Sequence, residues 1–484
     1  EKALRAGKPI IVGKIGQSEA GSRAAASHTA ALAGSQAAYR AMFECYGLIE
    51  ASDLDEMLDL AVGFLACGDK LPKGKRVGIC TSSGGAGVWM ADACASAGLE
   101  MPVLDTETRK SIDVHIPSYG TSQNPVDSTA QGVHKMGYAT FARLVANSPL
   151  IDGVMVVVTA RRSAFLEGDL PKLKDLKRDG TKPVFMWTYT LPSDRSIEIL
   201  NEAGYPLFTG AHGCARTMAA MADYRALRER VLGSPVAASA AHAARDQVRG
   251  VLDASNDVLA EWQARPLLAL YGIGADAGTL VRSAKEAEKA ARALGRPVAL
   301  KVQSADIPHK TEAGAVALAI AAENAAAAHD TVLANARRYA PKAVIDGVLV
   351  QPMARPGREV ILGVKRDERW GPLLMVGLGG TLVEALGDIA LAPVPLDREQ
   401  AHALLAHLKG AAIFGAWRGM PEADTEALAG AMVKLAQFAA DHADDVAEID
   451  LNPVIVHAKG EGVSVVDALI VKRKAQAERR TAAE

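Results

Sequence analysis

The sequence has little of what marks secreted, membrane-spanning or nucleic-acid-binding proteins. Its 484 residues include only five cysteines, with no CxxC pair and no metal-ligand spacing, so disulfides and zinc sites are not expected. No apolar run approaches the roughly 20 residues that span a bilayer, and the start does not resemble a signal peptide. The net charge of -2 gives no electrostatic reason to expect nucleic acid or a membrane as a partner. We therefore expect a cytoplasmic protein.

The sequence also lacks an initiating methionine. The chain opens on EKALRAGKPIIVGKIG, which is typical of a helix end followed by an apolar strand, so we expect the natural protein to have a further N-terminal portion. What is present is ordinary for a globular protein, with 49% of the residues apolar and 23% charged. This length suffices for roughly three domains, each with its own core.

In the first half of the chain, short apolar strands alternate with amphipathic helices. This alternation is typical of parallel sheets covered by helices on both faces. It predicts a strand over residues 9–15 and a helix over 29–45, and then a strand over 76–81, a glycine loop and a helix that ends at Gly98. Later strands are expected at 153–159, 183–189 and 205–210. The pattern indicates an α/β fold with flavodoxin-like, doubly wound domains.

The second half has a different texture. Residues 234–247 lose periodicity and are rich in small residues, which favours a linker. From about Val258 the strands become longer and mix with helices in a way that suggests α+β subdomains. These strands are expected at 298–304, 347–353, 358–367, 372–380 and 462–471.

Four polar residues in these apolar strands point to nucleotide chemistry. Burying Lys301 without a partner would be costly, so a nucleotide phosphate is a sensible counter-charge. The alternative is a lysine near a strand end with its charge in water. Glu359 and the exposed strand edge before it can hold adenine and ribose. Asn452 and Asp467 offer hard oxygen ligands, which suit Mg²⁺ bridging nucleotide phosphates.

Two stretches of small residues are further candidates. SRAAASHTAALAGSQ (22–36) holds a single histidine, His28, which taken alone is compatible with a helix cap or a core position. SSGGAG (82–87) joins a strand to a helix, where backbone N–H groups and the helix dipole favour a bound phosphate. An ordinary strand-to-helix turn is the alternative. The candidate residues of this loop are Ser82, Ser83, Gly84 and Gly85.

Taken in order, these signals resemble the ATP-grasp fold, and the whole chain resembles the NDP-forming acyl-CoA synthetases, relatives of succinyl-CoA synthetase. The stretches that carry the resemblance are SHTAALAGS (27–35), TSSGGAGV (81–88), NPVD (124–127), DIPHKTEAGAV (306–316), GPLLMVGLGGTLVE (371–384) and EIDLNP (448–453). The resemblance implies that a carboxylic acid, CoA and ATP give acyl-CoA, ADP and phosphate, through an acyl phosphate and a phosphohistidine. It also implies Mg²⁺ as a cofactor and a homodimer.

The resemblance assigns roles to two histidines. His28 falls on the family's phosphorylated histidine, whose neutral imidazole nitrogen attacks a phosphoryl group and later passes that group on. The small residues around it would leave room for this attack. His309 matches a histidine on a mobile loop, proposed to carry the phosphoryl group between the acyl site and the nucleotide site. An exposed loop histidine is the alternative for His309.

The remaining site residues follow from the same resemblance. Asn124 and Asp127 are expected to shape the acyl pocket, although NPVD also fits a turn in which Pro125 restrains the backbone. Trp187 or Tyr189 could line a pocket for an aryl acid, or fill a core. The nucleotide-binding residues are expected to be Lys301, Gln351, Glu359 and Arg366.

The resemblance also implies how the chain is divided. It places the end of a succinyl-CoA synthetase-like flavodoxin-type domain with the phosphohistidine at 1–70, a second flavodoxin-like CoA-ligase domain at 71–233, a linker at 234–256, an ATP-grasp domain at 257–474 and a tail at 475–484. The relatives' N-terminal CoA-binding domain has no counterpart here, so the main CoA site is expected outside this chain. Two other functions remain open: a CoA- and ATP-dependent lyase, and a nucleotide-binding regulatory subunit without turnover.

Overall fold

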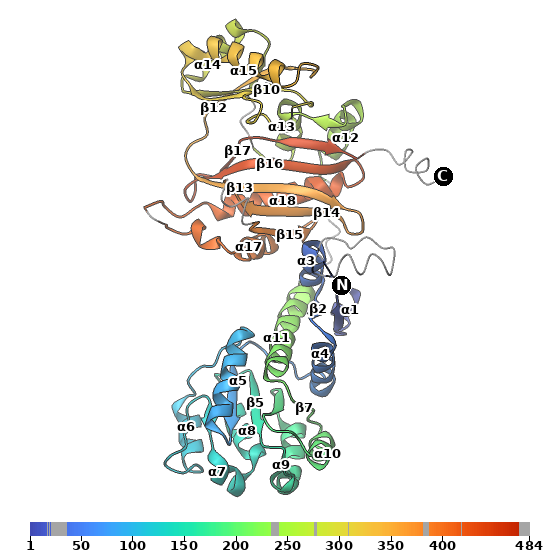
Figure 1. The fold of residues 1–484 in the computed structure, drawn as a ribbon, viewed down its shortest axis with the longest axis vertical. Coiled ribbons are helices and arrows are strands. Elements are labelled where there is room, and N and C mark those ends of the chain that lie inside the picture. Colours follow the sequence, from blue (N-terminus) through green and yellow to red (C-terminus); the bar gives the residue numbers. More distant parts are fainter. Residues whose placement is uncertain are drawn as a thin grey trace, which may run out of the picture. The chain divides into compact units, whose positions relative to one another are not determined.

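The computed structural model divides into two compact units, shown in Figure 1. The first unit consists of Glu1–Ala33 and Phe43–Val236, and the second unit of Gly34–Met42 and Ala237–Glu484. The structure describes residues 1–16, 18, 20, 36–233, 242–274, 278–307, 309–380, 387–417 and 419–473. His28 and the small residues at 22–35 lie outside the described residues. Within these ranges, none of the helices combines the length and the apolarity needed to cross a bilayer.

A five-stranded parallel sheet forms the centre of the first unit. The strands follow the order β4-β3-β5-β6-β7, in which the first strand lies between the second and the third, as in flavodoxin-like folds. Every residue of β3, β5 and β6 is buried, because helices cover both faces of this sheet. The predicted doubly wound fold is confirmed. The strands are β3 (Val77–Thr81), β4 (Val126–Asp127), β5 (Gly153–Val158), β6 (Val184–Thr188) and β7 (Leu207–Phe208).

Two hydrophobic cores lie on the two faces of this sheet. Alternate strand residues supply them: Val157 of β5 packs in the core with α5 and α11, whereas Val156 packs in the core with α8, α9 and α10. Trp187 belongs to the first of these cores, so it fills a core, while Tyr189 is partly exposed. The helices are α5 (Gly84–Ser96), α6 (Thr106–Asp113), α7 (Thr129–Met136), α8 (Tyr138–Asn147), α9 (Ala164–Asp179), α10 (Asp194–Glu202) and α11 (Ala211–Gly233).

The start of the chain forms a second, smaller parallel pair, β1 (Ile10–Gly13) with β2 (Leu48–Ala51). The strand expected at 9–15 is therefore present but shorter. Asp53 caps the following helix by accepting a hydrogen bond from the backbone N–H of Glu56. The helices of this region are α1 (Lys2–Arg5), α3 (Gln36–Tyr46) and α4 (Leu54–Cys67).

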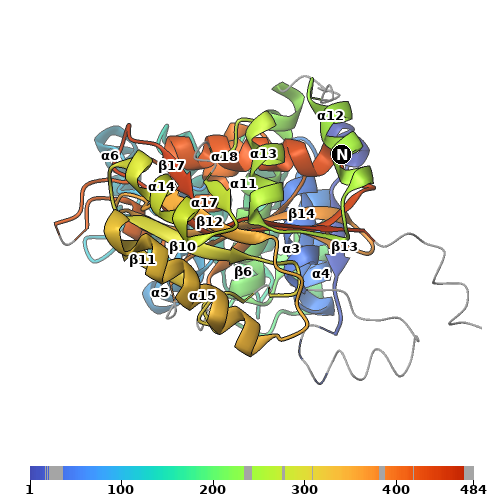
Figure 2. The same ribbon diagram turned by 90° about the horizontal axis from the view of Figure 1, so that it is seen from above.

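The second unit contains two antiparallel sheets, as the α+β pattern of the sequence suggests. The smaller has the order β11-β10-β12-β9, and Figures 1 and 2 show helices α14 (Ala284–Leu294) and α15 (Ala325–Tyr339) packed along it. Its strands are β9 (Thr279–Val281), β10 (Val298–Gln303), β11 (Val316–Ile320) and β12 (Gly347–Pro352), with the short helix η1 (Ala322–Asn324) before α15.

The larger sheet has the order β15-β14-β13-β16-β18-β8, with β17 paired to β16. Helix α18 packs against β13, β14 and β16 over the main core of the unit. The strands are β8 (Val258–Leu259), β13 (Arg358–Asp367), β14 (Gly371–Leu378), β15 (Ile389–Pro393), β16 (Val446–Val456), β17 (Val463–Val465) and β18 (Leu469–Lys472). The helices are α12 (Arg245–Ala254), α13 (Glu261–Leu270), α17 (Arg398–Ala406), η2 (Ala411–Phe414) and α18 (Thr425–Asp441).

Two expectations differ from the structure. Residues 245–254 of the expected linker form α12, and because Val248 and Leu252 are buried in the core of the second unit, this helix is part of that unit. The strand expected over 462–471 is two strands, β17 and β18, with Asp467 in the break between them. The break leaves the Val466 carbonyl to accept a side-chain hydrogen bond, and Asp467 itself accepts one from the Ala468 N–H.

Candidate nucleotide cleft and phosphate loop

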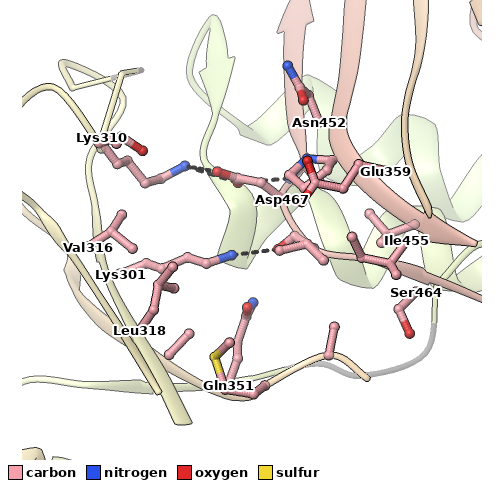
Figure 3. A pocket seen from close by; sticks show the side chains of 18 of the residues that line it. Lys301, Lys310, Val316, Leu318, Gln351, Glu359, Asn452, Ile455, Ser464 and Asp467 are labelled. Carbon is pink, nitrogen blue, oxygen red and sulfur yellow. Dashed lines mark hydrogen bonds and ion pairs between the residues drawn. The ribbon is translucent and has the colours of Figure 1, made fainter. Parts of the chain in front are cut away.

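A cleft of about 940 Å³ lies in the second unit, lined by strands of both its sheets. Figure 3 shows it from close by. Six residues predicted from the sequence line it, although they are spread over more than 150 positions of the chain. These residues are Lys301, His309, Gln351, Glu359, Asn452 and Asp467.

Lys301 is buried, with 3% of its surface exposed, and its charge has protein partners. Its Nζ donates to the Val466 carbonyl at 2.5 Å and lies 3.3 and 3.4 Å from the two carboxylate oxygens of Glu261. The alternative of a lysine with its charge in water is therefore wrong. A phosphate is also not needed as the sole counter-charge, because Glu261 supplies one.

Glu261, the first residue of α13, is a functional candidate that the sequence analysis missed. It is fully buried, and its Oε1 accepts hydrogen bonds from Arg265 at 2.8 Å and from Gln351 at 2.5 Å. Burial raises the pKa of this carboxyl, while the nearby Lys301 acts in the opposite direction. In the sequence, Glu261 and Arg265 resemble an ordinary pair four residues apart on a helix surface, so only their burial reveals them.

A second ion pair lies beside the first. Lys310 Nζ is 3.0 and 2.8 Å from the two carboxylate oxygens of Asp467, and Figure 3 shows both side chains meeting in the cleft. Burial acts to raise the pKa of Asp467, but Lys310 and Lys301 outweigh it and the pKa is lowered, so Asp467 is a carboxylate at neutral pH. With Arg265, three cations therefore face two carboxylates in this cluster, while Glu312, Glu359 and Asp450 add acidic side chains to the lining of the cleft. The ammonium groups of the two lysines are the donors that an anionic ligand needs.

The cleft also offers oxygen ligands of the kind that Mg²⁺ takes. Asn452 is exposed on β16, and Asp467 lies in the break before β18. Among the residues that the structure describes, no group of three or more His, Cys, Asp or Glu could hold a metal by itself. Mg²⁺ usually keeps several waters and binds through one or two protein oxygens plus phosphates. The pair therefore fits Mg²⁺ that arrives with a nucleotide.

The other predicted residues of this unit occupy different places. His309 is exposed where it lines the cleft, and Glu359 is exposed on β13. Arg366, seven residues further along β13, does not line the cleft, and its guanidinium donates to the Ala443 carbonyl at 2.6 Å. The structure therefore does not bring Arg366 to the other nucleotide candidates.

The loop predicted to bind phosphate lies in the first unit, between β3 and α5. Ser82 Oγ is 3.0 Å from the Tyr138 hydroxyl, and the Ser83 N–H donates to Thr81 Oγ1 at 2.9 Å. A Cβ at position 84 would lie 3.0 Å from Asp127 Oδ2, whereas one at position 85 would meet nothing within 4 Å. The close approach of Asp127 therefore favours glycine at position 84, and the helix begins at the carboxyl end of a central strand, where ligands of such folds bind.

The two NPVD residues have different surroundings. The Asn124 amide accepts from the Ile79 N–H at 2.9 Å and donates to the carbonyls of Val77 at 2.8 Å and Pro102 at 3.1 Å. Its donors and acceptor thus hold β3. Asp127 Oδ1 accepts from the Thr129 N–H at 2.9 Å, while its Oδ2 lies beside the loop, so Asp127 is the better placed to meet a ligand.

Comparison with protein families identifies three domains along the chain. A succinyl-CoA ligase like flavodoxin domain matches residues 1–64, a Ligase-CoA domain matches 77–160, and an ATP-grasp domain matches 250–471. The first two matches fall in the parallel-sheet half of the chain, and the third covers the strands and loops that line the cleft. The predicted fold class is confirmed.

Comparison with individual proteins points to one family. Acetate–CoA ligase [ADP-forming] I of Archaeoglobus fulgidus is 32% identical over 96% of this chain and 66% of that protein. The 4-hydroxybutyrate–CoA ligase [ADP-forming] of Nitrosopumilus maritimus is 30% identical over the same shares, so the chain spans about two thirds of the length of these relatives. The subunit beta of acetate–CoA ligase [ADP-forming] II of Pyrococcus furiosus is 38% identical over 46% of this chain and 95% of that subunit. The chain thus belongs to the family of ADP-forming acetate–CoA ligases, which are acyl-CoA synthetases.

Proposed function

We propose that this chain is the nucleotide-binding and phosphoryl-transferring part of an ADP-forming acyl-CoA synthetase. The reaction converts a carboxylic acid, CoA and ATP into acyl-CoA, ADP and phosphate. The observation that carries the proposal is the cleft, where Lys301, Gln351 and Asp467 converge from three distant segments around a cluster of paired lysine, arginine and carboxylate groups. The names of the relatives supply the class of reaction.

The cleft residues divide into two groups in this proposal. Lys301 and Lys310 bind the phosphates, and Asn452 and Asp467 hold Mg²⁺. When bound, Mg²⁺ neutralises part of the phosphate charge and orients the terminal phosphoryl group. Glu359 and the backbone edge at the end of β12 take the nucleoside, which places the terminal phosphate toward the exposed His309.

Two histidines carry the phosphoryl group between sites. An unprotonated ring nitrogen of His309 attacks the γ-phosphorus, the bond to the bridging oxygen breaks, and ADP leaves. The group then passes to His28 and from there to the carboxylate of the acid, which forms the acyl phosphate. CoA attacks the acyl carbon and releases phosphate. His28 lies outside the described residues, so its part in this sequence rests on the resemblance of SHTAALAGS (27–35).

The phosphate loop of the first unit is proposed as the acyl site. The N-terminus of the 13-residue helix α5 supplies backbone N–H groups and a dipole that favour a phosphoryl anion. Ser82 and Ser83 add hydroxyl groups, and Asp127 lies beside Gly84. These are the groups needed to hold phosphohistidine next to an acid.

Further parts of the proposal concern context. We propose a homodimer, with the domain boundaries predicted from the sequence. Cys67, Cys80, Cys94 and Cys214 are buried free thiols, which suits a reducing compartment such as the cytoplasm. The relatives are named for acetate and for 4-hydroxybutyrate, so the acid is not assigned.

Labelling with ATP tests the proposed function. ATP with a radioactive γ-phosphate should label the wild-type protein in an acid-labile, base-stable form, and peptide mapping should find this label on His28. His28→Asn should carry label on His309 alone and should not form acyl-CoA, because Asn has no nitrogen that attacks phosphorus. His309→Ala should bind Mg-ADP normally in calorimetry yet label His28 far more slowly.

Three outcomes contradict parts of this proposal. Acyl-CoA formation by His28→Asn at the wild-type rate would remove the phosphohistidine at position 28. A wild-type rate in His309→Ala would remove the shuttle. Tight Mg-ADP binding without labelling or acyl-CoA formation would instead support a nucleotide-binding regulatory subunit.

A further inference from the structure

A hydrogen-bonded polar pair at the cleft consists of Ser464 of β17 and His457, which follows β16. The proposed function assigns no role to either residue. Across the larger sheet, Glu359 of β13 pairs with Ile455 of β16, and Ile455 pairs with Ser464. Directly paired residues of antiparallel strands place their side chains on the same face. All three line the cleft, and Figure 3 shows them on the same side of it. Ser464 therefore faces the ligand space.

The hydrogen bonds of His457 determine where the hydroxyl proton of Ser464 lies. The ring is buried, with Nδ1 3.3 Å from the Pro356 carbonyl and Nε2 2.8 Å from Ser464 Oγ. A carbonyl oxygen can only accept, so in the neutral imidazole Nδ1 carries the ring proton and Nε2 is the acceptor. Ser464 then donates its single proton to His457. Its oxygen presents only lone pairs to the cleft.

The backbone around His457 holds this arrangement in place. Its N–H donates to the Gly462 carbonyl at 3.1 Å, and its carbonyl accepts from the Asp424 N–H at 2.9 Å. The Asp424 carboxylate in turn accepts from the N–H groups of Gly460 and Gly462, which belong to the turn between β16 and β17. The imidazole is thus fixed beside Ser464, and the hydroxyl remains an acceptor.

Two other polar side chains that line the cleft already have protein partners, whereas Glu359 is a second acceptor on the same face as Ser464. Gln351 donates to Glu261, and Arg355 pairs with Glu461 at 3.1 Å. Figure 3 shows Lys301 and Lys310 reaching in from the opposite side, away from Ser464. If the phosphates of a nucleotide bind at the two lysines, its nucleoside lies on the side of the cleft where Ser464 is. An acceptor there matches a donor on the nucleoside.

We propose that Ser464 accepts a hydrogen bond from the nucleoside of the bound nucleotide, and that His457 is the positioning residue that keeps Ser464 an acceptor. This inference rests on the proposed nucleotide site and deepens it. The donor is either the exocyclic amine of adenine or a hydroxyl of the ribose, which share the same chemistry. A nucleotide without that donor would leave the Ser464 oxygen unpaired and would bind more weakly.

Calorimetry with four Mg-nucleotides tests the inference. ADP, IDP, 2′-deoxyADP and 3′-deoxyADP would be titrated into the wild-type protein and Ser464→Ala. Loss of one such hydrogen bond should weaken ADP binding to Ser464→Ala by about 2- to 12-fold. One analogue should bind both proteins equally, because it already lacks the donor. If IDP is the analogue that binds both proteins equally, the donor is the amine of adenine. If it is a deoxy nucleotide, the donor is the missing ribose hydroxyl.

Variants of His457 separate positioning from mere support of the fold. His457→Gln should preserve the preference for ADP, because the Gln Oε1 can still accept from Ser464, whereas His457→Ala should lose it. Thr331→Ala is the matched control, since its exposed hydroxyl on α15 donates only to the Ala327 carbonyl, and its binding should be unchanged.

The outcomes distinguish this inference from the proposed function. Failure of the wild-type protein to bind any of the four nucleotides would overturn the proposed function and this inference with it. Tight ADP binding with equal affinities in wild type and Ser464→Ala for all four nucleotides would overturn this inference alone. Equal discrimination in His457→Ala and wild type would also overturn the positioning role.

Discussion

The two candidate sites are assembled in opposite ways. In the first unit, Ser82, Ser83 and Gly84 follow one another along a single strand, turn and helix, with Asp127 one strand away. In the second unit, the cleft collects residues from α13, both sheets and the segment that holds His309, over positions 261–467. A parallel sheet thus presents its site at one strand end, whereas the cleft exists only after distant segments have packed.

The two sites also differ in how they handle charge. The loop of the first unit relies on backbone N–H groups and hydroxyls, with Asp127 beside it. The cleft buries Glu261 and Lys301, which would be costly if either lost its partner. A site built from backbone N–H groups and hydroxyls therefore contributes little to the stability of its unit. A cleft built on buried ion pairs makes the stability of its unit depend on the site residues.

The largest effect on stability is expected from removal of Glu261, because two buried cations of the cleft depend on this carboxylate. Glu261→Ala leaves Arg265 and Lys301 buried without their carboxylate, so the free energy of unfolding of the second unit should fall by about 3–5 kcal/mol. Urea unfolding followed by fluorescence measures it. Glu359→Ala, at an exposed position of the same cleft, is the control and should change the value by less than about 0.5 kcal/mol. Equal losses in both variants would contradict the buried network.

Asn124 and Asp127 sharpen the contrast within the first unit. Asn124→Ala removes two hydrogen bonds to β3 and one to the Pro102 carbonyl, and the free energy of unfolding should fall by about 1–3 kcal/mol. Asp127→Ala should cost less than Asn124→Ala, because one backbone N–H depends on it, yet it should slow phosphorylation of His28. Denaturant unfolding and the labelling assay measure the two effects. A greater loss of stability in Asp127→Ala than in Asn124→Ala would contradict a structural role for Asn124 and a ligand-facing role for Asp127.

The smallest expected effect concerns pH, away from both sites. Asp105 caps α6 and accepts hydrogen bonds from the Thr108 N–H and hydroxyl and from Ser148, which lower its pKa to about 2. A lowered pKa stabilises the fold above the ordinary value near 4, and this stabilisation is lost as the pH falls toward 2. Asp105→Ala should therefore cost about 1 kcal/mol at pH 7 and progressively less below about pH 4. A difference in unfolding free energy that does not change with pH would contradict this.

Most strands could be predicted from the sequence, whereas a site residue that is recognisable only by its burial could not. The strand predicted at 358–367 has those same bounds, because a long apolar run with alternating partners leaves few other structures. Glu261 was missed because a glutamate at a helix start usually faces water. Asp467 was found, but its strand was predicted to be continuous, because the apolar residues on both sides of it outweighed one residue that disfavours strands.

The sequence by itself determined the flavodoxin-like sheet and the α+β character of the second half, and it supplied the candidate residues of the phosphate loop and of the nucleotide site. These follow from local periodicity and from motifs whose chemistry lies within a few residues. Only the tertiary structure decided that Lys301 shares a buried carboxylate with Arg265 and Gln351, that Arg366 lies away from the cleft, and that the hydroxyl group of Ser464 hydrogen-bonds to His457. The reason is physical: the partner of a buried charge or hydroxyl is set by which distant segments pack together, and neighbouring sequence carries no record of that choice.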